Sequence, residues 1–135
     1  KNKFFFFHLF NSNILNLDLP ILGLCYGHQL IAKEFGGAIA NTGKGEFGKA
    51  ILQQTSDFPL WQNVSFPNQV WMSHQDIVTK IPYGFKKIAS TQNSKFAIIS
   101  NEKKKFYGVQ WSQWCGTDRQ SACRVRGNHT GRGML

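Results

Sequence analysis

One cysteine stands among residues that favour nucleophilic chemistry. Cys25 lies between Gly23 and Gly27, directly after the apolar run 21–24 and before a segment of helix-forming residues. A nucleophile between two glycines, where a buried strand turns sharply into a helix, is typical of the nucleophile elbow. The free N–H groups and the dipole of a helix N-terminus stabilise a thiolate. We therefore predict that Cys25 is a nucleophile; the alternative is a small buried apolar residue.

The neighbours of this cysteine are expected to complete the elbow. The backbone N–H of Tyr26 would point at an oxyanion that forms beside the sulfur. Glycines are expected at positions 23 and 27 because a Cβ there would clash with the neighbouring strand or helix. The helix should run over residues 27–35 and end at the glycine pair 36–37.

Composition bounds the class of protein. A chain of 135 residues, 41% hydrophobic and with twelve Phe, corresponds to one domain or part of one. The formal charge is +9, but the lysines are scattered apart from 103–105, which we expect at a solvated hairpin tip. We therefore predict no nucleic-acid partner. Three cysteines without a C-x-x-C pair predict no disulfide framework, no metal site and a reducing, cytoplasmic setting.

The two ends of the chain differ from its middle. The apolar start, 1–11, is too short for a secretory signal or a membrane span, so no membrane partner is expected. All lysines lie at or before Lys105 and all arginines lie after it. From Trp111 onward the sequence is rich in Ser, Gly, Cys and Trp and shows no periodicity. We interpret 111–135 as a tail from a shifted reading frame, a fusion or a sequencing artefact, which resequencing of the coding DNA would test.

The middle, 12–110, has the pattern of an α/β domain with a mixed sheet. Polar residues Ser73 to Asp76 follow a predicted strand and are typical of a site rim; alternatively, Ser73 and Asp76 cap a following turn or helix. Turns are expected at 41–45 and 82–85 and a short helical connector at 57–61. The predicted strands are 21–24, 38–40, 46–52, 69–72, 86–90, 96–100 and 106–110.

Five segments carry a resemblance to a known family. Gly-Leu-Cys-Tyr-Gly-His-Gln at 23–29 resembles the nucleophile motif of class I glutamine amidotransferases. The segments 45–48, 70–76, 88–91 and 106–110 resemble, in the same order, the glutaminase domain of GMP synthases. Trp-Met-Ser-His-x-Asp at 71–76 is the most discriminating of them. The resemblance implies a class I glutamine amidotransferase-like, flavodoxin-like mixed sheet flanked by helices, here incomplete.

The same resemblance implies an activity. The domain would hydrolyse L-glutamine to glutamate and ammonia through a thioester on Cys25. The N–H of Tyr26 would supply half of the oxyanion hole. Gln29 and the backbone of Ser73 and His74 would help to hold the glutamine.

It also implies a partner. Ammonia would pass to an ATP-pyrophosphatase synthetase domain that uses ATP and Mg²⁺ to aminate xanthosine monophosphate to GMP in purine biosynthesis. His74 and Asp76 would lie near that domain. The glutaminase part itself would need no cofactor.

The sequence departs from the family pattern at several points. In the family, Gly-Val-Gln is followed by Phe-His-Pro-Glu, which supplies the general base and its orienting carboxylate, whereas 111–114 here is Trp-Ser-Gln-Trp. Gly45 and Gln75 stand where the family often has Arg and Gly. The earlier strand-helix-strand unit, its glycine-rich loop and a Ser-Gly-Gly-x-Asp-Ser motif are not found. These departures predict strongly impaired turnover.

Two further interpretations remain open. One is a working amidotransferase of another pathway, such as carbamoyl-phosphate or aminodeoxychorismate synthesis, although the segment 71–76 speaks against it. The other is a non-enzymatic binding module of the same fold in which Cys25 is a relic. Selective labelling of Cys25 by a glutamine-analogue electrophile would distinguish an enzyme from such a module.

Overall fold

Strands are the main regular structure in the described part of the chain, as segments of alternating apolar and polar residues predict. The structure is a computed structural model that describes residues 11–58, 60, 64–111 and 113–114. The N-terminal segment 1–10 and most of the tail from 112 onward therefore lie outside the described residues. The elements are η1 (Ser12–Asn16), β1 (Ile21–Leu24), α2 (Tyr26–Glu34), β2 (Ala38–Gln54), β3 (Asn68–Lys80), β4 (Lys86–Ser90), β5 (Ile98–Asn101), β6 (Phe106–Val109) and β7 (Gln113–Trp114).

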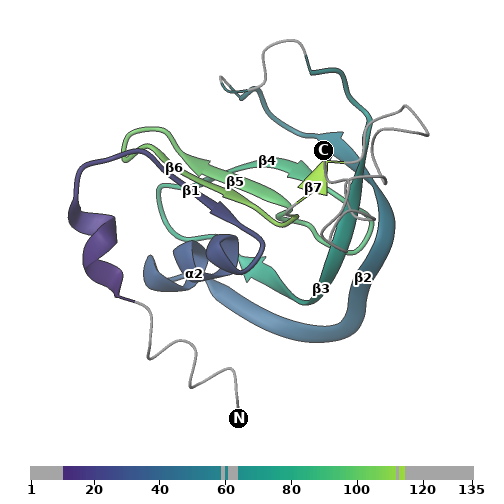
Figure 1. Ribbon diagram of the computed structural model, residues 1–135, viewed down its shortest axis with the longest axis horizontal. Coiled ribbons are helices and arrows are strands. Elements are labelled where there is room, and N and C mark those ends of the chain that lie inside the picture. The colour runs from purple at the N-terminus through teal and green to yellow at the C-terminus, as the bar shows by residue number, and fades with distance from the viewer. Residues whose placement is uncertain (1–10, 59, 61–63, 112, 115–135) are drawn as a thin grey trace, which may run out of the picture.

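The strands form one mixed sheet in the order β1-β6-β5-β4-β2-β3-β7. Only β1 and β6 pair in parallel among the described strands; every other neighbouring pair is antiparallel. In Figure 1 the sheet is strongly curled, and α2 lies inside the curve formed by β2 and β3. The predicted α/β class with a mixed sheet is confirmed, and the described residues contain one α-helix.

The long ribbon of β2 and β3 corrects the expected turn at 41–45. Strand β2 continues through this segment, and the pairing with β3 shifts register between Asn41 and Glu46. Gly43 has a φ of 75°, which glycine adopts without strain. The turn-like composition therefore produces an irregularity inside a strand, because the ladder with β3 holds the chain extended on both sides of it.

The expected position of the polar segment 73–76 is also wrong. These residues lie in the middle of β3, so they neither follow a strand nor cap a turn or helix. Ladder partners on β2 extend the strand beyond Met72, and the alternation of faces places His74 inside while Ser73 and Gln75 are exposed.

The remaining local predictions differ little from the structure. Helix α2 begins one residue earlier than expected, and β4 has the predicted bounds. The turn at 82–85 forms with Gly84 at a φ of 84°, and the lysines 103–105 lie in the exposed β5–β6 turn. In the connector 57–61, the described residues Asp57, Phe58 and Leu60 are not helical.

Two clusters of buried side chains fill the space on either side of the sheet. The cluster on the side of α2 consists of Ile31, Ala32, Val78, Phe85, Ile99 and Phe106. The other consists of Leu52, Phe58, Val70, Met72, Ile88, Ala89, Ala97, Ile98, Val109 and Trp111. Helix α2 thus sits against β1 and β6 and holds the residue that precedes it, Cys25, above the end of these two strands.

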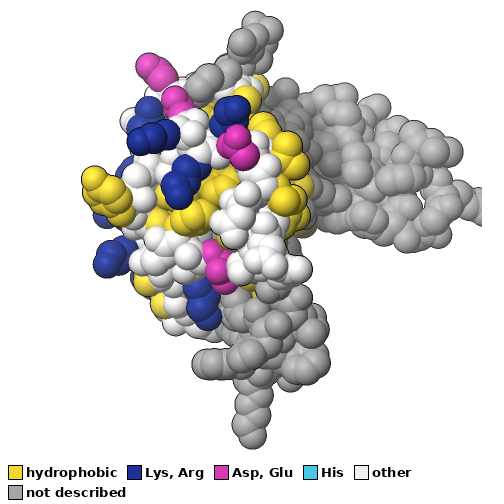
Figure 2. Space-filling model, turned by 90° about the vertical axis from the view of Figure 1, so that its left-hand side faces the viewer, with side chains coloured by type: hydrophobic (Ala, Val, Ile, Leu, Met, Phe, Trp, Pro, Cys, Tyr) yellow, Lys and Arg dark blue, Asp and Glu magenta, His cyan; other side chains and the backbone are white. Residues whose placement is uncertain are grey.

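Strand β1 forms an edge of the sheet within the described residues. Gly23 faces α2, while Leu22 and Leu24 point to the opposite side and are 56% and 47% exposed. Ile14, Leu17 and Leu19 are exposed as well. Figure 2, which views the molecule from the side of η1, shows hydrophobic side chains lying side by side among lysines and acidic residues. No helix in the described part of the chain has the length and apolar character needed to cross a membrane.

Candidate active site

Cys25 lies at a sharp bend between β1 and α2. Its backbone has φ 52° and ψ −103°, and it is the N-cap residue of the helix. The Cys25 N–H donates a hydrogen bond to the carbonyl of Val109 at 2.7 Å, which continues the parallel pairing of β1 with β6 by one residue. The predicted elbow is therefore present, with the cysteine at the carboxyl end of a strand and the amino end of a helix.

The two glycines of the elbow play different parts. A Cβ on Gly23 would lie 2.6 Å from the backbone of Gly27 and 2.7 Å from Cδ1 of Ile31, so only glycine allows the helix to approach β1 this closely. A Cβ on Gly27 would meet nothing within 4 Å. The expected clash is confirmed at position 23 and wrong at position 27, because position 27 faces away from the strand.

The Cys25 thiol is partly buried, and this burial dominates its acidity. Burial raises the pKa of Cys25 above its ordinary value of 9.0, while a hydrogen bond from the backbone of Tyr26 lowers it by a smaller amount. The backbone of Tyr26, the first residue of α2, is thus next to the sulfur. The elbow alone leaves the thiol protonated at neutral pH, so rapid attack would require a base.

Three of the predicted site residues surround one cavity. A space of about 520 Å³ is lined by Tyr26 and Gln29 from α2 and by Asp76 from β3. The Gln29 side chain is buried, and its Nε2 donates to the Asp76 carbonyl at 2.9 Å. Lys33 and the segment 37–41 complete the wall. The structure therefore brings the first turns of the elbow helix together with β3 at a cavity large enough for an amino acid.

The other three predicted residues, Cys25, Ser73 and His74, do not line this cavity; Cys25 directly precedes Tyr26, which does. Ser73 is exposed on β3. The His74 ring is buried; its Nε2 lies 3.1 Å from Glu46 Oε1 and its Nδ1 lies 3.1 Å from the Asp76 carbonyl. Both ring nitrogens of His74 therefore contact other groups of the protein. Of Ser73 and His74, only the backbone could contact a ligand, as the sequence predicted.

His28, inside the nucleophile motif, is a core residue. Its ring is fully buried against Gly108, where an added Cβ would overlap Nδ1, and neither ring nitrogen has a hydrogen-bond partner in good geometry among the described residues. Burial lowers its pKa to about 4, and nearby His74 adds to the lowering, while backbone groups of Phe96 and Gly108 act in the opposite direction. His28 is therefore neutral at physiological pH.

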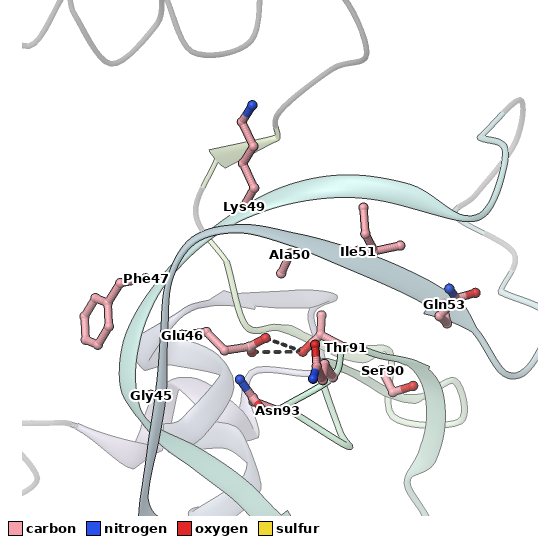
Figure 3. Close-up of a pocket in the computed structure, with 11 residues that line it drawn as sticks. Gly45, Glu46, Phe47, Lys49, Ala50, Ile51, Gln53, Ser90, Thr91 and Asn93 are labelled. Atoms are coloured by element: carbon pink, nitrogen blue, oxygen red, sulfur yellow. Dashed lines mark hydrogen bonds between the residues drawn. The ribbon is translucent and has the colours of Figure 1, made fainter.

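Sequence analysis missed a buried polar cluster beside the site. Glu46 on β2 is 7% exposed and accepts hydrogen bonds from Thr91 Oγ at 2.8 Å to each carboxylate oxygen. Figure 3 shows its side chain pointing from β2 towards Thr91, while Phe47 and Lys49 point away. The alternation of Glu46, Gly48, Ala50 and Leu52 on the inner face of β2 was the available signal. Glu46 and Thr91 line a separate cavity of about 630 Å³ that includes no residue of the elbow.

The end of β6 lies beside the elbow. Because Cys25 bonds to Val109, the residues that follow Val109 continue past the cysteine. Gln110 is fully buried and Trp111 packs into the core, while Ser112 lies outside the described residues. Among the described residues, no group of three or more His, Cys, Asp or Glu is arranged to hold a metal ion.

Comparison with known proteins agrees with this geometry. The sequence model of the family described as "Glutamine amidotransferase class-I" matches residues 7–111. The chain is 46% identical over 101 residues to "GMP synthase [glutamine-hydrolyzing]" of Campylobacter hominis, covering 75% of the chain and 20% of that protein. Identity to the protein of the same description in Treponema denticola is 44% over 100 residues, covering 74% and 19%. The chain thus spans about a fifth of the curated relatives it matches.

Solved structures share the fold. A protein from Thermoplasma acidophilum, assigned as part of a GMP synthase, superimposes with a TM-score of 0.69 at 26% identity, over 73% of this chain and 50% of that one. A glutamine amidotransferase from Thermotoga maritima superimposes with a TM-score of 0.68 at 22% identity, over 80% and 46%. The curled mixed sheet with its elbow helix is therefore a known architecture.

Proposed function

The chain belongs to the class I glutamine amidotransferase family, and on this premise we propose that Cys25 is the nucleophile that attacks the side-chain amide of L-glutamine. The observation that carries the proposal is the strained elbow, which places the sulfur at the N-terminus of α2. Sγ bonds to the amide carbon, the C–N bond breaks, and ammonia leaves with the thiol proton. Water then hydrolyses the γ-glutamyl thioester to glutamate and restores the thiol.

The neighbouring groups have assigned parts in this proposal. The N–H of Tyr26, the first residue of α2, stabilises the oxyanion of the tetrahedral intermediate. Gln29 and the backbone at 73–74 hold the glutamine. The His74 ring is buried against Glu46. Of the two residues expected near a partner domain, Asp76 is therefore the one proposed to contact it.

Turnover by this chain is expected to be slow. A base must take the thiol proton, since burial raises the pKa of Cys25. Neither described histidine is free to act as this base, because His28 is enclosed beneath Gly108 and His74 is bound by Glu46. The family's histidine and glutamate positions hold Ser112 and Trp114. Loss of a positioned base costs about 10²–10⁴ in rate, so we expect both the formation of the thioester and its hydrolysis to be slow.

The curated relatives suggest where the ammonia goes. Both are described as glutamine-hydrolysing GMP synthases, and this chain matches only a fifth of each. We therefore propose that the domain supplies ammonia to an ATP-pyrophosphatase synthetase part, where ATP and Mg²⁺ would activate xanthosine monophosphate for amination to GMP.

Covalent labelling tests the proposed nucleophile. The chain is incubated with a diazoketone analogue of L-glutamine, and the modified residue is identified by peptide mass spectrometry. We expect selective labelling of Cys25 rather than Cys115 or Cys123, protection by L-glutamine, and a rate that rises with pH beyond 9 because the pKa is raised. Cys25→Ala is the control. Equal labelling of all three cysteines, or no protection by L-glutamine, would contradict the proposal.

A further inference from the structure

A chain of buried hydrogen bonds connects the far side of the sheet with the elbow helix. It begins at Thr91, after β4, whose hydroxyl oxygen accepts from the Ser94 N–H at 3.1 Å and therefore donates its own proton to Glu46. The other contact of the carboxylate is His74 Nε2 at 3.1 Å. Glu46 thus joins a turn, β2 and β3 through hydrogen bonds of its buried carboxylate.

The partners of His74 fix how protons are shared. Nδ1 faces the Asp76 carbonyl, which can only accept, so Nδ1 carries a proton. Nε2 faces a carboxylate oxygen of Glu46, and one proton lies between these two atoms. Removal of the carboxylate would leave Nε2 and the Thr91 hydroxyl buried without their partner, which is costly.

The last link reaches the nucleophile. The Asp76 carbonyl that accepts from His74 also accepts from Gln29 Nε2 at 2.9 Å. Gln29 lies one turn after Cys25 in α2, and its N–H donates to the Cys25 carbonyl at 3.3 Å. Gln29 therefore links the Asp76 carbonyl to the first turn of α2 through two hydrogen bonds, one from its side chain and one from its backbone.

We infer that Glu46 is a positioning residue for the nucleophile. By holding the His74 ring, it fixes the Asp76 carbonyl between two donors. That carbonyl in turn fixes Gln29 and the first turn of α2, and so the direction in which Cys25 presents its sulfur to an amide. This inference rests on the proposed function of Cys25, and it extends the site to a carboxylate that touches neither the elbow nor its cavity.

Two variants of Glu46 test the inference in the full chain. The measured quantity is the rate of Cys25 labelling by the diazoketone glutamine analogue divided by the rate with iodoacetamide, a small reagent that needs no alignment. Glu46→Ala should lower this ratio about tenfold or more, since small misplacements cost up to about 10² in rate. Glu46→Gln, which can still bond to Thr91 and His74, should stay within about threefold of the unaltered chain. Exposed Glu102→Ala should leave the ratio unchanged.

A second readout separates this inference from the proposed function. The side-chain amide protons of Gln29 are followed by NMR, because their exchange depends on the bond to Asp76 and not on any reaction. Glu46→Ala should accelerate this exchange, even if the analogue shows no selectivity for Cys25. If Glu46→Ala does not fold, Thr91→Val removes one donor to the carboxylate and should lower the labelling ratio and accelerate the exchange in the same direction. Unchanged Gln29 exchange in a folded variant would overturn the inference.

Discussion

The backbone of Cys25 has a positive φ of 52° in a residue that is not glycine. Such conformations cost about 1–3 kcal/mol and persist only where the surroundings hold them. Here two features hold Cys25 in this conformation. Its N–H is hydrogen-bonded to Val109 on β6, and its carbonyl accepts the first hydrogen bond of α2. The local sequence predicted the bend at Cys25 because the strand, the glycine and the helix are adjacent along the chain. Glu46 was not predicted as a site residue because its partner Thr91 is 45 residues away.

His28 makes stability depend on pH. Its pKa in the folded chain is about 4, against 6.5 for an ordinary histidine, so the unfolded chain binds more protons between these values. The free energy of unfolding should therefore fall as the pH is lowered from 6.5 to 4, by about 3 kcal/mol in total. Urea unfolding of the unaltered chain and of His28→Leu at several pH values measures this. The variant should have the shallower pH dependence, and parallel curves would contradict the assignment.

At the scale of elements, local signals predicted the strand-elbow-helix, β4 and the two exposed turns. They failed where pairing between distant segments decides the structure. Asn-Thr-Gly-Lys-Gly at 41–45 has the composition of a turn, but its neighbours on both sides pair with β3 and keep the segment within β2. The polar residues 73–76 are strand residues for the same reason. Ladder formation with a distant strand therefore outweighed local composition in both segments.

The elbow glycines provide a matched pair of substitutions. Gly23→Ala should destabilise the protein by about 1–3 kcal/mol, because the new methyl group overlaps the backbone of Gly27. Gly27→Ala should be neutral or stabilise by about 0.5–1 kcal/mol, since this position is helical and open. Denaturant unfolding of both variants measures the difference. Equal effects would show that α2 does not approach β1 as closely as described.

At the scale of the whole molecule, the part of the sheet that the structure describes has an edge at β1 with exposed apolar side chains. The sequence indicated a mixed sheet, but the strand order and the curl depend on the long β2–β3 pairing, which no local pattern encodes. Within the described residues β1 has a neighbour, β6, on one side only. Free edges beside exposed leucines favour association of chains.

Charge on β1 should therefore prevent association. The double variant Leu22→Lys with Leu24→Lys introduces two positive charges on the uncovered side without touching the buried Gly23. We expect the unaltered chain to form concentration-dependent oligomers in sedimentation experiments and the double variant to remain mainly monomeric. Tyr83→Lys, a change at a fully exposed residue in a distant turn, is the control and should not alter association. A monomeric unaltered chain would refute the prediction.

The register shift in β2 has a consequence for how the protein can be engineered. Between the pairs Asn41–Asp76 and Glu46–His74, β2 has the four residues 42–45 where β3 has only Gln75, so β2 carries three extra residues there. Residues 42–44 are exposed and lie outside the wall of the cavity beside Gln29, and paired residues flank them on both sides. A short epitope or fluorophore-binding sequence could therefore be inserted within 42–44. The insertion should leave the Glu46 side chain pointing inward and the paired start of β2 in place.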